Sequence, residues 1–139
     1  MAEIAEEVSA FLKVVQQIKI KFDVETKQID SDERILRNIM FNLISNASKY
    51  SDPHKNIYLS CSKNKNEMIF SIQDEGIGIP TEDHKHLFDR FFRASNAINI
   101  QGTGLGLNIV KRYVNLLNGD ITFNSEYGKG STFIVSIPH

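Results

Sequence analysis

The stretch "NIMFNLISNASKYS", residues 38–51, is the centre of the longest helical pattern in the chain. Apolar residues recur there every three or four positions, which predicts a helix with one buried face. The pattern begins a few residues earlier, and we expect a helix over about 32–50, with Asp30 or Ser31 as its N-cap. The apolar face comprises Ile35, Leu36, Ile39, Met40, Leu43, Ile44 and Ala47.

One edge of this helix carries asparagines at four-residue spacing. Asn38, Asn42 and Asn46 fall on one line, with Lys49 close to it. Asparagine is a poor helix former, so three asparagines at four-residue spacing allow two interpretations. They are a solvated edge, or they are one wall of a ligand site. In the second case an amide oxygen suits Mg²⁺ beside phosphates, and Lys49 neutralises phosphate charge.

The pattern changes several times along the chain. We expect helices over 3–16, 81–90 and 105–117, and strands over 18–24, 57–61, 68–72, 120–126 and 131–137. Strands and helices do not strictly alternate. The order therefore predicts an α+β fold, a two-layer α/β sandwich in which helices cover one face of a mixed sheet. A length of 139 residues predicts a single domain over 1–139.

Composition excludes some classes of function. The apolar fraction is 41% and the net charge is −1, so no strongly basic nucleic-acid surface is expected. The single cysteine, Cys61, cannot form an internal disulfide and is expected in the core. We find no signal peptide and no apolar run long enough to span a membrane. We expect a cytoplasmic domain with no direct membrane contact, whose parent protein can be membrane-anchored.

A glycine-containing stretch, "DEGIGIP" at 74–80, comes directly after the strand expected over 68–72. Gly76 and Gly78 permit backbone conformations and close approaches that a Cβ would block. Asp74 is an acceptor when ionised and could accept a hydrogen bond from the exocyclic amine of adenine, directly or through water. The carbonyl of guanine would be repelled there. The alternative is an aspartate that only forms a turn.

A second glycine run, "GTGLGL" at 102–107, precedes the last predicted helix. Free N–H groups at a helix start form an anion site, although glycine turns before helices are also common. The run is neither a dinucleotide fingerprint nor a P-loop. The similar "GKGST" at 128–132 lies between strands, so we expect Lys129 at a hairpin tip.

Five stretches in order are more specific than any one of them: "NIMFNLISNASKYS", "DEGIGIP", "LFDRFFR", "GTGLGL" and "GKGSTF". Together they resemble the catalytic ATP-binding domain of bacterial sensor histidine kinases. The resemblance covers nearly the whole chain. It implies the Bergerat (GHKL-type) ATP-binding fold, which gyrase B-type topoisomerases and heat-shock chaperone ATPases share, with ATP and Mg²⁺ as cofactors.

The resemblance also implies site residues. Asn46 matches the magnesium ligand, and Asp74 matches the adenine-recognising aspartate. Asn42, Lys49, Arg90 and Arg93 match catalytic positions, the arginines as phosphate contacts during transfer. Phe88, Phe91 and Phe92 match a phenylalanine box, for which core packing is an equally good explanation, and 94–103 matches a lid. The implied nucleotide-binding set is Asn42, Asn46, Lys49, Tyr50, Asp74, Gly76, Gly78, Ile79, Phe88, Gly102, Thr103, Gly104, Leu105, Gly106, Leu107 and Thr132.

Position 42 bears on the reaction. Hydrolytic relatives carry a water-activating glutamate at the place of Asn42, and an amide cannot act as a general base near neutral pH. The resemblance therefore implies a kinase, whose acceptor histidine lies in a helical dimerisation segment. His54, His84, His86 and His139 lack that sequence context, and we expect His84 and His86 to be surface residues.

The expected partners are the helical histidine-phosphotransfer domain of the same parent protein and a downstream response regulator. The isolated chain is expected to be a monomer. Two alternatives stay open: a non-catalytic nucleotide-sensing module, and an anti-sigma-type serine kinase of the same fold.

Overall fold

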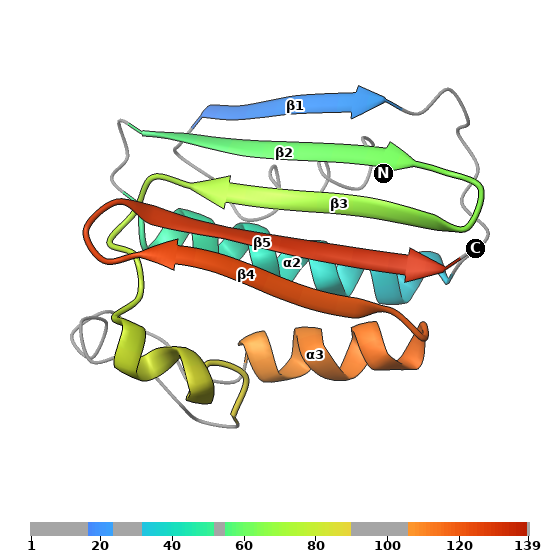
Figure 1. Ribbon diagram of the computed structural model, residues 1–139. Helices are drawn as coiled ribbons and strands as arrows, with labels where there is room; N and C mark the ends of the chain where they lie inside the picture. Colours follow the sequence, from blue (N-terminus) through green and yellow to red (C-terminus); the bar gives the residue numbers. More distant parts are fainter. Residues whose placement is uncertain (1–16, 24–31, 52–54, 90–105, 139) are drawn as a thin grey trace.

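The computed structural model describes residues 17–23, 32–51, 55–89 and 106–138. Within these ranges a five-stranded sheet forms one layer, and two α-helices cover one of its faces (Figure 1). The strands are β1 (Gln17–Asp23), β2 (Asn56–Lys63), β3 (Glu67–Asp74), β4 (Asp120–Glu126) and β5 (Gly130–Pro138), in the spatial order β1-β2-β3-β5-β4. The β1–β2 pair is parallel and the other pairs are antiparallel. The predicted mixed sheet and two-layer α+β sandwich are confirmed.

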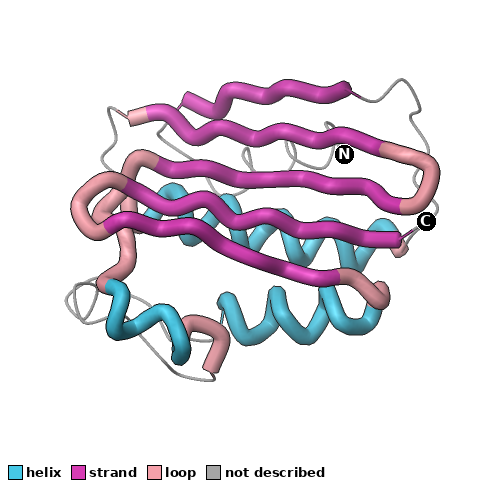
Figure 2. The backbone as a smooth tube through the Cα atoms, viewed as in Figure 1, coloured by secondary structure: helices cyan, strands magenta, loops and turns pink. Residues whose placement is uncertain are grey.

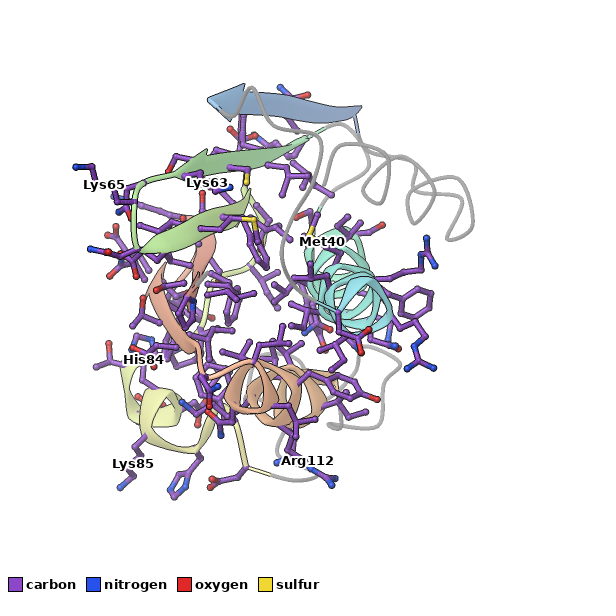
Figure 3. The ribbon with its side chains drawn as sticks, turned by 90° about the vertical axis from the view of Figure 1, so that its right-hand side faces the viewer. Met40, Lys63, Lys65, His84, Lys85 and Arg112 are labelled. Carbon is purple, nitrogen blue, oxygen red and sulfur yellow. The ribbon has the colours of Figure 1, made fainter. Side chains whose placement is uncertain are left out.

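The core lies between the sheet and the helices. Alternate residues of β2, β3 and β5 are buried, as the period of a strand with one covered face requires. Figure 3 shows Met40 between α2 and the sheet, whereas Lys63 and Lys65 extend from the β2–β3 hairpin. The fully buried side chains include Leu36, Ile39, Met40, Leu43, Ile44, Ile57, Leu59, Phe70, Ile72, Val110, Val114 and Ile137. Cys61 is buried in this core, as predicted.

Helix α2 spans Glu33–Lys49, and its N-cap differs from the prediction. Asp32, rather than Asp30 or Ser31, caps the helix, because its Oδ1 accepts hydrogen bonds from the backbone N–H groups of Arg34 at 2.9 Å and Ile35 at 3.4 Å. An aspartate there satisfies free N–H groups of the first turn and stabilises the positive end of the helix.

The predicted helix over 81–90 is shorter and tighter than expected. It is a 3₁₀ helix, η1, over Thr81–His86. The backbone N–H groups of Leu87 and Asp89 continue the same i to i−3 pattern onto the carbonyls of His84 and His86. This tight winding buries Leu87 while the rest of the short segment stays near the surface.

Helix α3 spans Gly106–Leu116 and ends close to the predicted position. Asn118 adopts a positive φ of 59°, and the N–H of Gly119 reaches back to the carbonyl of Val114 at 2.9 Å. A Cβ on Gly119 would lie 2.4 Å from the carbonyl oxygen of Ser136, so only glycine fits this helix end.

Some predictions fall outside the described residues. They concern the helix over 3–16, the residues Arg90, Phe91, Phe92 and Arg93, the lid over 94–103, and the four positions Gly102, Thr103, Gly104 and Leu105. None of the helices in the described ranges is long and apolar enough to cross a membrane.

Candidate functional site

Five chain segments meet at one end of the sheet. The last turn of α2, the ends of β3 and β4, and the starts of β5 and α3 all lie on the left in Figure 1. Loop 75–80 and turn 127–129 close the same end, where Figure 2 draws them as loop segments. Asn42, Asn46 and Lys49 of the helix edge lie toward this end of α2, as do the described residues of both glycine runs, whereas Asn38 lies in the first half of the helix.

Asp74 is a buried carboxylate at the end of β3, with 8% of its surface exposed. Its Oδ1 accepts a hydrogen bond from the N–H of Gly76 at 2.9 Å. Burial raises the pKa of Asp74 to about 6, although hydrogen bonds from the backbone of Gly76 and Ser131 act in the opposite direction. The side chain is thus an acceptor near neutral pH that packs inside the protein rather than on a solvated turn.

The first glycine loop, residues 75–80, lies between α2 and the β4–β5 hairpin. A Cβ on Gly76 would lie 2.2 Å from the carbonyl oxygen of Tyr50, which accepts the N–H of Ile77 at 3.1 Å. Gly78 has a φ of 69°, and its Cβ would lie 2.0 Å from the carbonyl oxygen of Glu126. Glycine is required at both positions because backbone approaches backbone on each side of the loop.

Both backbone polar groups of Ile79, at the end of this loop, have hydrogen-bond partners. Its N–H donates to Ser125 Oγ on β4 at 2.8 Å, and its carbonyl oxygen lies 2.9 Å from His84 Nε2 on η1. The His84 ring also packs edge-to-face against Phe123, with 5.1 Å between centroids. His84 is therefore a partly buried structural residue and not the surface residue that the sequence suggested.

The asparagine edge of α2 faces the start of α3. Asn42 Nδ2 donates to the carbonyl of Asn38 at 2.9 Å, one turn earlier. A Cβ on Gly106 would lie 3.4 Å from Asn42 Oδ1 and 3.6 Å from Asn46 Oδ1. The described end of the second glycine run thus lies next to the asparagine edge. Within the described ranges, no group of three or more histidine, cysteine or acidic side chains could hold a metal ion.

The remaining predicted residues differ in their surroundings. Lys49 is exposed in the last turn of α2, and Tyr50 is the half-buried C-cap. Three of them, Ile79, Phe88 and Leu107, are partly buried and pack against the core, so each has a structural role. Phe88 packs edge-to-face against Phe123, with centroids 5.8 Å apart.

Thr132 does not lie beside Asp74. In the β3–β5 ladder Thr132 pairs with Gln73, whereas Asp74 pairs with Ser131. Neighbouring residues of a strand point to opposite faces, so Thr132 lies on the uncovered face and the buried Ser131 lies on the face of Asp74. Position 131, not 132, is adjacent to the candidate base site.

Sequence reasoning missed two serines, Ser131 and Ser125. A usable signal was present for Ser131, because Phe133, Val135 and Ile137 alternate inward and place residue 131 on the same face. Its pairing with Asp74 depends on the register between two strands far apart in sequence, which the alternation does not give. Ser125 is found only through its contacts across the hairpin.

The sequence matches a known family and several known kinases. Residues 31–139 match the model of the histidine kinase-, DNA gyrase B-, and HSP90-like ATPase family. The chain is 38% identical over 128 residues to the circadian input-output histidine kinase CikA of Synechococcus elongatus, a match that covers 88% of this chain and 17% of that protein. It is 43% identical over 102 residues to the sensor protein SrrB of Staphylococcus aureus, covering 72% of this chain and 18% of the relative.

Solved structures give the same result for the fold. The mycobacterial sensor histidine kinase MprB matches with a TM-score of 0.87 and 24% identity, covering 99% of this chain and 95% of that one. Full-length ShkA in complex with AMPPNP matches with a TM-score of 0.81 and 27% identity, covering 99% of this chain and 28% of that one. The chain spans less than a fifth of the length of the curated relatives that it matches.

Proposed function

The chain belongs to the family of histidine kinase-, DNA gyrase B-, and HSP90-like ATPases, as a catalytic ATP-binding domain of the sensor histidine kinase type, and on that premise we propose its reaction. The domain binds Mg²⁺·ATP at the end of the sheet where Asp74 lies. It presents the γ-phosphate to the Nε2 of a histidine in a separate helical domain. The observation that carries the proposal is that the end of α2 lies against both glycine segments. A Cβ on Gly106 would lie 3.6 Å from Asn46 Oδ1, and a Cβ on Gly76, whose N–H donates to Asp74, would lie 2.2 Å from the carbonyl oxygen at the end of α2.

The buried carboxylate of Asp74 supports recognition of adenine. An ionised carboxylate accepts hydrogen bonds and donates none, so it fits an exocyclic amine and repels a carbonyl oxygen. The glycines at 76 and 78 keep the adjoining backbone close to the ends of α2 and β4. This rigid loop would hold Asp74 in a fixed position when the base binds.

The asparagine edge and the start of α3 support binding of the triphosphate. Asn46 Oδ1 would ligate Mg²⁺ as a neutral oxygen, and Lys49 would neutralise phosphate oxygens. The N–H groups at the start of α3, from Gly106 and Leu107, would hold phosphate at the positive end of the helix. A bound Mg²⁺ ion would neutralise charge on the phosphates during transfer. The residues present fit this ion, because their contribution is a neutral amide oxygen rather than a carboxylate cluster.

The amide at position 42 supports transfer rather than hydrolysis. Its nitrogen already donates to the helix backbone at Asn38, and its oxygen faces Gly106. An amide oxygen has no useful basicity near neutral pH, so Asn42 cannot activate water. Its role in the site is to bind and position. The bound nucleotide then awaits a different nucleophile, with Arg90 and Arg93 proposed as further phosphate contacts.

The acceptor histidine is proposed to lie outside this chain. Residues 1–139 form one catalytic domain, monomeric when isolated, that works with the helical domain of its parent protein. The phosphoryl group would pass from that histidine to an aspartate of a response regulator. The described histidines His84 and His86 contact Ile79 and Asp89, and neither is proposed as the acceptor.

Phosphotransfer can be tested with the chain joined to the histidine-bearing helical segment of its parent protein. Incubation with radiolabelled ATP and Mg²⁺ should give acid-labile, alkali-stable phosphate on the helical segment, and Asn46→Ala should abolish it. Acid-stable phosphate on a partner would instead indicate a serine kinase. ATP binding with no transfer would indicate a nucleotide-sensing module.

A further inference from the structure

Three hydrogen-bonding contacts converge on one hydroxyl group next to the first glycine loop. Ser125 Oγ accepts the N–H of Ile79 at 2.8 Å and lies 3.0 Å from the carbonyl oxygen of Gly130. It also lies 2.8 Å from Ser131 Oγ. Ser125 therefore connects the loop after β3, the start of β5 and the serine that pairs with Asp74.

Counting protons fixes the direction of each bond. A hydroxyl has one proton and two lone pairs. The Gly130 carbonyl can only accept, so it takes the proton of Ser125. Both lone pairs of Ser125 then accept, one from Ile79 N–H and the other from the hydroxyl of Ser131. All three contacts are hydrogen bonds only in this arrangement, and it uses up the proton of Ser131.

The consequence is a second acceptor beside Asp74. Ser131 is buried and pairs directly with Asp74 across β3 and β5. With its proton directed at Ser125, its oxygen can offer only lone pairs to a ligand. An amino group on a purine carries two N–H donors, whereas a 6-oxo purine offers a carbonyl oxygen at the same place. Two adjacent acceptors favour the amino group.

We propose that Ser125 is a positioning residue that anchors the first glycine loop through Ile79 and keeps the Ser131 hydroxyl as an acceptor, so that the base site selects 6-amino over 6-oxo purine nucleotides. The proposal rests on the proposed binding of ATP at this end of the sheet. Ser125 is not assigned a contact with the nucleotide. His84, on the other side of Ile79, completes the hold on the loop.

The test compares Ser125→Ala with wild type by two measurements. Amide hydrogen exchange at Ile79 without nucleotide reports the anchor, and calorimetric titration with ATP and ITP reports selectivity. We expect faster exchange at Ile79, ATP binding weaker by about three- to tenfold, and an ATP-over-ITP preference reduced by about threefold or more. ATP binding weakens because one net hydrogen bond is lost. The ATP-over-ITP preference falls because the Ser131 hydroxyl proton is then free to bond to the 6-oxo group.

Companion variants separate the two roles. Ser125→Thr keeps the hydroxyl and should restore both measurements. Ser131→Ala should weaken ATP binding while leaving exchange at Ile79 slow, because the Ser125–Ile79 bond persists. Ser136→Ala is the control variant, since it removes a serine hydrogen bond of the same sheet, to Glu67 at 2.6 Å, on the uncovered face and at the other end of β5. It should change neither measurement.

Failure of the Ser125 proposal can be distinguished from failure of the proposed ATP binding. Unchanged exchange at Ile79 in Ser125→Ala, or equal weakening of ATP and ITP, would overturn the proposal even where wild type binds ATP. If Ser125→Ala does not fold, retention of full ATP preference by Ser131→Ala would overturn the selectivity argument. Absence of ATP binding by folded wild type would refute the proposed function and the selectivity argument, and exchange at Ile79 would still decide the anchor.

Discussion

At the scale of single residues, the burial of the Asp74 carboxylate is the largest unfavourable electrostatic effect in the described structure. An ionised carboxylate that is 92% removed from solvent is unfavourable unless its partners compensate, and its raised pKa shows that compensation by two backbone N–H groups is incomplete. Such a group weakens the fold near neutral pH. Its retention is consistent with a role in binding, where an amine would supply the missing donor.

The pH dependence of stability tests the unfavourable effect of burying ionised Asp74. Because the folded pKa of Asp74 is about 6, above its ordinary value of 3.8, folding favours the protonated side chain. This contribution to stability is complete below the unfolded pKa and is lost as pH rises through 6. Asp74→Asn should be more stable than wild type at pH 7.5. This advantage should shrink by about 1.4 kcal/mol at pH 5. Urea unfolding of both proteins at the two pH values measures it, and a constant difference would contradict the assignment.

At the scale of elements, the glycine loop and the β4–β5 hairpin form one packed unit. Gly78 and Gly128 both adopt positive φ, at 69° and 83°, but only Gly78 faces another backbone segment. Lys129 lies at the hairpin tip as predicted and forms an exposed ion pair with Glu126 at 3.2 Å. The two glycines thus offer a matched pair that separates conformational strain from steric conflict.

We expect Gly78→Ala to be far more destabilising than Gly128→Ala. A Cβ at 78 meets the Glu126 carbonyl, whereas a Cβ at 128 has no heavy atom within 4 Å. Gly128→Ala should lose only about 1 kcal/mol from the positive φ, and Gly78→Ala about 3 kcal/mol or more. Denaturant unfolding compares them. Equal losses would show that the loop moves away from the hairpin at low cost.

Gly106→Ala separates folding from binding at the start of α3. The nearest atom to a new Cβ there is Asn42 Oδ1 at 3.4 Å, which is ordinary contact, and alanine favours helix over glycine by up to about 1 kcal/mol. Thermal stability should be unchanged or slightly higher. ATP affinity should fall severalfold if phosphate approaches this backbone. Unchanged affinity would remove the start of α3 from the proposed phosphate site.

Element types followed from the sequence where hydrophobic periodicity was long and regular. The seven apolar positions of α2 and the alternation in β2, β3 and β5 predicted their buried faces. Competing local hydrogen bonds decided the two details that the prediction gave wrongly. The first turn of α2 is capped by Asp32, and the tight bonding after Pro80 makes η1 a 3₁₀ helix. Periodicity does not resolve either of these choices.

At the scale of the whole molecule, the strand order places the candidate site. The β3–β5–β4 arrangement brings residues 74, 125 and 131 to the same end of the sheet, and α2 and α3 bring residues 46 and 106 beside them. Motif order predicted Asp74, Asn46 and the glycines as candidates. It did not give Ser131 or Ser125, because long-range register and cross-hairpin hydroxyl bonds leave no local pattern.

The most direct test of the account is calorimetric titration of the folded chain and of Asp74→Asn with ATP and GTP in the presence of Mg²⁺. We expect wild type to bind ATP in preference to GTP. We expect Asp74→Asn to stay folded and to bind ATP at least about tenfold more weakly, because a hydrogen bond to a charged acceptor is lost. Equal ATP affinity in the two proteins, or no ATP binding by folded wild type, would contradict it.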